Sequence, residues 1–140
     1  MSAPAHVLVA YEPSRSGDDA VRRAAELAAE AGARLTVVTV AVSEPTDRKC
    51  CDTRSVYWNG VLRELAGDEL SRAVMAVGPD AGAEFRVISG RSVSSAIAEE
   101  AERCKADVVV VSRERGLLPW TRLRRARKVQ RRTSRAVIVA

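Results

Sequence analysis

The stretch Ala106-Asp107-Val108-Val109-Val110-Val111 is the most apolar run in this chain of 140 residues. Its four consecutive valines have no polar residue between them, and β-branched side chains favour strands. A strand that is apolar on both sides is typical of a parallel sheet covered by helices on each face. This stretch therefore predicts an inner strand of a parallel sheet.

Four other segments of strand character surround this stretch, and helical patterns separate them. The segments are residues 6–11, 33–42, 83–88 and 135–140, and the half-polar segment 83–88 is expected at an edge. Apolar residues recur at helical spacing in residues 18–31, 55–77 and 93–104, and a further helix is expected within the basic segment before the last strand. We expect Ser16 or Asp18 to cap the first helix and Gly32 to end it. Alternating strands and helices predict an α/β fold, an open parallel five-stranded sheet with helices on both faces, in one domain over residues 1–140.

Composition excludes several classes of protein. No apolar run approaches the ~20 residues that span a bilayer, so no membrane association is expected. The amino-terminal residues lack the pattern of a secretory signal, which favours a cytoplasmic protein. The chain has three cysteines, Cys50, Cys51 and Cys104. Because this number is odd, we expect free thiols and no disulfide scaffold. Whether Cys50 and Cys51 respond to oxidants stays open.

The sequence shows no enzymatic constellation. His6 is the single histidine, and we expect it at the surface or at a strand edge. Glu12 is the one carboxylate at a strand end that could act as a base or hold a metal ion, and a solvated loop position is the commoner case. Glycines spaced closely enough for a phosphate loop are absent. We therefore predict a protein that binds and does not catalyse, with no catalytic residue and no metal site.

Positive charge is concentrated in residues 113–135. This segment has ten basic residues and one acidic residue, a charge of +9, so the rest of the chain carries −4 to give the net +5. A solvated surface, a docking site for an acidic protein or a small anion, and nucleic-acid binding all stay open. Nucleic acid is disfavoured because only Trp120 offers an aromatic platform nearby. The candidate anion-binding and partner-binding residues are Arg122, Arg124, Arg125, Arg127, Lys128, Arg131 and Arg132.

The chain resembles a universal stress protein domain over essentially its whole length. The resemblance rests on residues 6–14, 35–40, 87–91, 106–113 and 136–140, in that order. It implies a Rossmann-like sheet of strand order 3-2-1-4-5 and a role in stress survival or regulation. It also implies a homodimer, formed by pairing the last strands, Ala136, Val137, Ile138 and Val139.

One branch of that family binds ATP, and this chain departs from its motif. The Asp that ends the first strand in that branch corresponds to Glu12 here. The three motif glycines correspond to Ser112, to Arg115 or Gly116, and to Arg125. Side chains at these places would crowd the phosphates, so we expect no cofactor and disfavour ATP.

A nucleotide-binding protein with weak ATPase activity stays open as an alternative. It would use Glu12 for Mg²⁺ and arginine side chains for the phosphates. If a nucleotide does bind, its contacts are expected to be Glu12, Val40, Ser112, Arg113, Arg115 and Gly116. A third reading is an adaptor that binds nucleic acid or an acidic partner through the basic segment.

Overall fold

The computed structural model describes residues 4–42, 53–78, 82–113 and 123–140, with residues 53–59 described by their backbone alone. Its centre is a five-stranded sheet of order β3-β2-β1-β4-β5, in which every neighbouring pair is parallel. This arrangement confirms the predicted fold class and strand order. The strands are β1 (His6–Ala10), β2 (Arg34–Val42), β3 (Glu84–Gly90), β4 (Val108–Val111) and β5 (Ala136–Val139).

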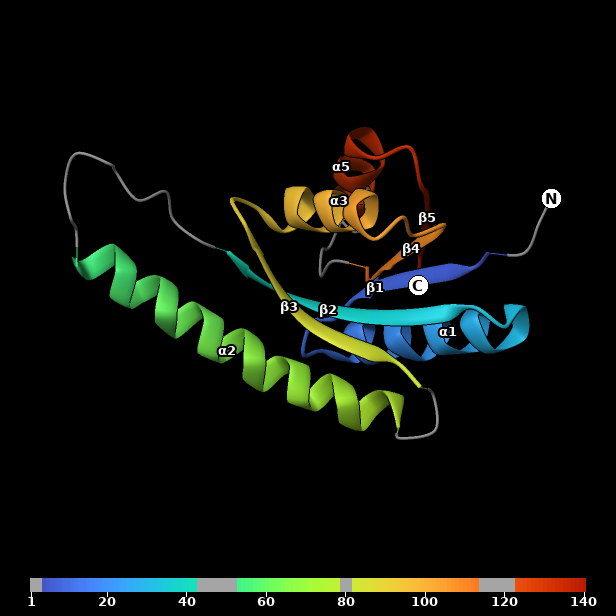
Figure 1. Ribbon diagram of the computed structural model, residues 1–140, viewed down its shortest axis with the longest axis horizontal. Helices are drawn as coiled ribbons and strands as arrows, with labels where there is room; N and C mark the ends of the chain where they lie inside the picture. Colours follow the sequence, from blue (N-terminus) through green and yellow to red (C-terminus); the bar gives the residue numbers. More distant parts are fainter. Residues whose placement is uncertain (1–3, 43–52, 79–81, 114–122) are drawn as a thin grey trace.

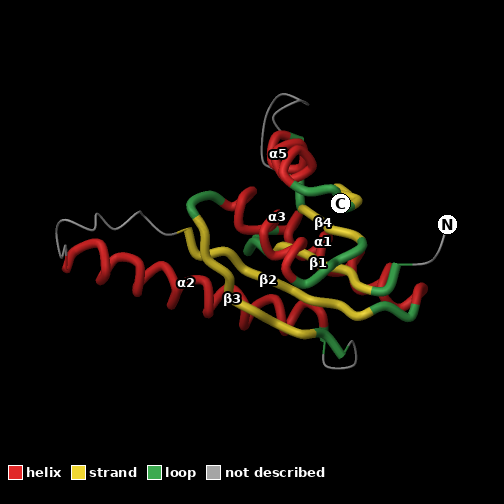
Figure 2. The backbone as a smooth tube through the Cα atoms, turned by 45° about the horizontal axis from the view of Figure 1, so that its top comes forward, coloured by secondary structure: helices red, strands yellow, loops and turns green. Residues whose placement is uncertain are grey.

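Helices cover both faces of this sheet (Figure 1). One face carries α1 (Arg15–Ala31) and α2 (Thr53–Val77), and the other carries α3 (Val93–Arg103) and α5 (Arg124–Arg132). Figure 2 shows α5 and β5 together at the end of the sheet where the chain finishes. No helix in the described part of the chain is long and apolar enough to cross a membrane.

The four valines of β4 explain why helices must cover both faces of the sheet. Val109 and Val111 pack in the core beneath α3 and α5, whereas Val108 and Val110 pack in the core beneath α1. Side chains of a strand alternate between faces, so each face needs its own helices. In β1, Leu8 lies in the first core and Val7 and Val9 lie in the second, and all three are fully buried.

The start of α1 differs from the prediction. The helix begins at Arg15, and its cap is Ser14, whose hydroxyl oxygen accepts the Gly17 N–H at 3.0 Å. Neither Ser16 nor Asp18 takes this role, because the chain turns three residues earlier and Ser14 already satisfies an exposed helical N–H. Gly32 ends the helix as predicted, with a φ of 62° that a glycine adopts without strain.

The sequence predicts His6 at the surface or at a strand edge, and the structure places it at the start of β1 but buried, with 6% of its area exposed. It is the first residue of the central strand β1, so β2 and the segment leading to β4 cover it. Its ring has a polar partner on each side: Nε2 lies 2.7 Å from Thr36 Oγ1, and Nδ1 lies 3.2 Å from the Cys104 carbonyl oxygen. The histidine therefore has a structural role at this strand. Cys104 is a free, half-buried thiol, and Cys50 and Cys51 fall outside the described residues.

Candidate functional site

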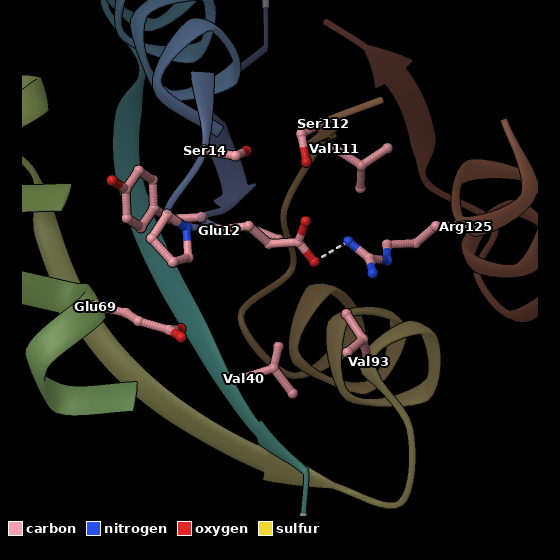
Figure 3. Close-up of a pocket in the computed structure, with 11 residues that line it drawn as sticks. Glu12, Ser14, Val40, Glu69, Val93, Val111, Ser112 and Arg125 are labelled. Atoms are coloured by element: carbon pink, nitrogen blue, oxygen red, sulfur yellow. Dashed lines mark hydrogen bonds and ion pairs between the residues drawn. The ribbon is translucent and has the colours of Figure 1, made fainter. Parts of the chain in front are cut away.

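A cavity of about 400 Å³ opens at the carboxyl ends of β1, β2 and β4 (Figure 3). β1 and β4 are neighbours, and the connections that follow them run in opposite directions and on opposite faces of the sheet, from β1 through α1 to β2 and from β4 through α5 to β5. Ligands bind at such switch points in open α/β sheets. The cavity is lined by Ala10, Tyr11, Glu12, Pro13, Ser14, Val40, Glu69, Val93, Val111, Ser112 and Arg125.

An ion pair between Glu12 and Arg125 lies inside this cavity. Arg125 Nη1 donates to Glu12 Oε1, and Figure 3 shows the two side chains pointing toward each other, one from the loop after β1 and the other from α5. The arginine side chain is 18% exposed and the glutamate side chain 38% exposed. A partly desolvated pair of this kind holds its geometry better than a surface pair. It joins the loop after β1 to the first turn of α5, 113 residues later.

The backbone around Glu12 is fixed by short-range contacts. The Ser14 N–H donates to the Glu12 carbonyl oxygen at 2.8 Å, and the Tyr11 N–H donates to the Val38 carbonyl oxygen at 2.8 Å. Gly17 packs so closely on this loop that a Cβ there would collide with the Glu12 carbonyl oxygen. The position of Glu12 is therefore set before any ligand enters.

Tyr11 anchors the same loop from the other side. Its hydroxyl donates to Asp18 Oδ1 at 3.0 Å, across the first turn of α1. Burial raises the pKa of this phenol, and the hydrogen bond to Asp18 raises it further. Tyr11 therefore stays a neutral hydrogen-bond donor at physiological pH.

Glu69 brings a second carboxylate to the cavity from α2. It lies on the same face of the helix as the buried residues Ala66 and Ala73. Thr39 Oγ1 donates to the Ala66 carbonyl oxygen at 2.8 Å, which ties that face to β2. Burial raises the pKa of Glu69, and the charge of Glu12 raises it further, with a partial offset from Arg72. The ionisable lining groups thus include two carboxylates and one guanidinium.

Several residues singled out in the sequence meet here. Glu12, Val40, Ser112 and Arg125 all line the cavity, and Ser112 is only 4% exposed. Arg113 is exposed and does not line it. Arg115, Gly116 and Arg122 lie outside the described residues. Arg125, which the sequence grouped with the surface cations, points into the cavity instead.

Sequence reasoning missed Glu69 and Val93 as lining residues. A signal for Glu69 existed, because residues 66, 69 and 73 have helical spacing and two of the three are buried alanines. A glutamate among the buried residues of one helix face indicates either a polar pocket or a wrong assignment of which face is buried. Nothing in the local pattern around Val93 separates it from an ordinary core position.

The remaining predicted cations lie on the opposite side of α5 from the core. Ala126 and Val129 are buried against the sheet and α3, whereas Arg124, Arg127, Lys128, Arg131 and Arg132 are exposed. The predicted dimer strand is β5, at the edge of the sheet. Its residues Val137, Ile138 and Val139 are half-buried, and Ala136 is exposed.

The comparisons with known proteins agree with this architecture. The model of the universal stress protein family matches residues 5–139. A universal stress protein solved in complex with cAMP is 26% identical, with 99% of this chain and 98% of that chain covered and a TM-score of 0.64. Universal stress protein UspA from Lactobacillus plantarum is 18% identical, and the match covers 96% of this chain and 95% of that chain with a TM-score of 0.75.

A third structure, the universal stress protein from Archaeoglobus fulgidus in complex with dAMP, is 23% identical. It covers 99% of this chain and 98% of that chain, with a TM-score of 0.62. No curated protein matches the chain by sequence.

Proposed function

The chain belongs to the universal stress protein family, and from that premise we propose that it is a stress-response protein that acts by binding an adenine nucleotide with a single phosphate. The ligand would occupy the cavity that holds the Glu12–Arg125 ion pair. In this proposal the protein works as a homodimer through β5. The proposed ligands do not include ATP bound with its phosphates against a glycine-rich loop.

The observation that carries the proposal is a guanidinium inside a ligand-sized cavity. A volume of about 400 Å³ falls in the range of small-molecule sites. A guanidinium has five N–H donors in a planar fork, so Arg125 can serve a carboxylate and a phosphate together. The Ser112 hydroxyl lies in the same lining and offers a further donor.

The other lining groups favour one phosphate over three. Glu12 and Glu69 are both carboxylates, so each added phosphate would meet unfavourable charge. A triphosphate in a glycine loop lies against bare backbone N–H groups. Here residues 112 and 125 carry side chains that line the cavity. The solved relatives in complex with cAMP and dAMP support the same ligand class.

The weak-ATPase alternative would need Glu12 as the ligand of Mg²⁺. The Glu12 carboxylate is already paired with Arg125, so a metal ion would have to displace that guanidinium. This competition favours binding without turnover.

Calorimetric titration with adenosine, AMP, cyclic AMP and Mg-ATP tests the proposal. We expect AMP or cyclic AMP to bind more tightly than Mg-ATP. Arg125→Ala should weaken the binding of AMP and cyclic AMP roughly 10- to 100-fold, because a hydrogen bond to a charged group contributes about 1.5–3 kcal/mol. Adenosine lacks the phosphate, so its affinity should differ by no more than about twofold between the native protein and Arg125→Ala.

Two further variants sharpen the result. Arg127→Ala removes an exposed cation of the same helix and should leave every affinity unchanged. Glu12→Gln loosens the ion pair and should tighten AMP binding. Tighter binding of Mg-ATP than of AMP, or an equal loss of adenosine and AMP in Arg125→Ala, would contradict the proposal.

A further inference from the structure

The outward face of α5 carries five cations in one stripe. Arg127 and Lys128 lie three and four residues after Arg124, and Arg131 and Arg132 lie three and four residues after Lys128. All five side chains are exposed. At 1.5 Å per residue the stripe is about 12 Å long. Burial of Ala126 and Val129 fixes the orientation of the helix, so the exposed cations lie on the side turned away from the core.

The cations of this stripe lack ion-pair partners in the described part of the chain, although Arg132 lines a pocket together with Glu99 and Glu102. Like charges four residues apart repel, as at 124 and 128 and at 127 and 131. Arg124 also lies at a helix start without a side-chain cap, where the helix dipole disfavours a cation. A polyanion would relieve both effects.

The composition of the face selects the kind of polyanion. Gln130 is the other exposed residue of α5, so the exposed part of the helix offers no apolar or aromatic side chain. Protein interfaces usually have an apolar centre, and single-stranded nucleic acids bind through aromatic stacking. A surface made only of cations matches the phosphates of a duplex, which binds by charge neutralisation. Four of the five residues are arginines, which contact phosphate oxygens bidentately.

We propose that this face of α5 binds the phosphate backbone of double-stranded DNA without reading its sequence. The absence of aromatic platforms, which disfavoured nucleic acid in the sequence, applies to single strands and not to a duplex. This interaction is separate from the cavity, because the five cations lie on the outer side of α5 and Arg125 points inward. It adds a second binding surface to the protein.

Fluorescence anisotropy with a labelled 20-base-pair duplex tests the proposal, using the full chain between 50 and 200 mM NaCl. Five phosphate contacts predict a slope of log K against log salt near −4.5 for each α5 face that contacts the duplex, since each contact contributes about 0.9. Arg127→Gln with Arg131→Gln should reduce the magnitude of that slope by about 2 and weaken binding roughly tenfold at 50 mM salt. A duplex of unrelated sequence should bind equally well.

The matched control changes two exposed cations of α1. Arg22→Gln with Arg23→Gln removes the same charge from the opposite face of the sheet and should leave the duplex affinity within about twofold. Circular dichroism confirms that both double variants are folded. Equal losses in the two variants, no duplex binding at 50 mM salt, or preferential binding of a poly-glutamate peptide that the α5 variant abolishes would overturn the proposal.

Discussion

Gly17 determines where Glu12 lies, although it is outside the cavity itself. It occupies the first turn of α1, and an added Cβ would meet the Glu12 carbonyl oxygen and lie 2.8 Å from the carbonyl carbon. Backbone atoms cannot move aside as the end of a flexible side chain can. The absence of one methyl group therefore helps to place the carboxylate that pairs with Arg125.

Gly17→Ala should accordingly destabilise the protein and weaken nucleotide binding together. Overpacking a tight contact costs about 1–3 kcal/mol, which exceeds the ~1 kcal/mol that Ala adds over Gly within a helix. Urea unfolding and the AMP titration measure the two effects. Gly67→Ala is the matched control, because nothing lies within 4 Å of its added Cβ, and it should stabilise α2. A Gly17→Ala protein as stable as the native one would show that the loop yields without cost.

At the scale of elements, the strands were more predictable from sequence than the site. The valines of residues 108–111 mark a strand whatever surrounds them, because burial on both faces leaves no room for a polar side chain. The cap of α1 could not be chosen, since Ser14, Ser16 and Asp18 all suit a helix start. Only the turn after β1 selects Ser14.

The partner of Glu12 was beyond local pattern reasoning for a similar reason. Arg125 flanks the buried stripe of α5 in a run of cations, and sequence alone does not show which cation turns inward. Its contact spans 113 residues and depends on the docking of α5 against α3 and β5. Glu12, Val40 and Ser112 were predictable, because the carboxyl ends of parallel strands meet at one edge of a sheet.

The packing of α2 against this edge should depend on pH through Glu69. Its pKa is raised in the folded protein, so the native state holds the proton more tightly than the unfolded chain does. The resulting stability is fully present below about pH 4, where an unfolded glutamate is protonated, and is lost as pH rises through the raised pKa. Glu69→Gln should therefore be more stable than the native protein at pH 7, by a margin that vanishes near pH 4.

Urea unfolding at the two pH values measures that margin. Glu64→Gln removes the same charge from an exposed position of α2 and serves as the matched control. A Glu69→Gln margin that did not change with pH would mean that the carboxylate is solvated in the folded protein.

For the molecule as a whole, β5 is one of the two edge strands of the sheet, the other being β3. It pairs with β4 on one side, and no strand of the described residues lies on the other. The Ala140 N–H donates inward to the Val111 carbonyl oxygen at 3.0 Å. Backbone groups alternate along a strand, so the N–H groups of Val137 and Val139 point outward. An apolar edge with free N–H groups is a template for a second copy.

A second copy paired antiparallel along β5 would be related by a two-fold axis perpendicular to the sheet. Such an axis keeps each face of the sheet on its own side, so both α5 helices would lie on the same face. The two cation stripes would then present ten positive charges to one duplex. Dimer formation and the salt dependence of DNA binding should therefore change together.

Val137→Pro tests this arrangement because it removes one outward N–H and leaves the inward hydrogen bonds to β4 in place. Sedimentation equilibrium at about 10 μM should give twice the chain mass of 15.1 kDa for the native protein and a shift to monomer for the variant. Val137→Ala loses similar packing but keeps the N–H, so it should remain a dimer. The monomeric variant should also show a shallower salt slope with DNA, whereas a native protein that sediments as a monomer would refute the β5 pairing.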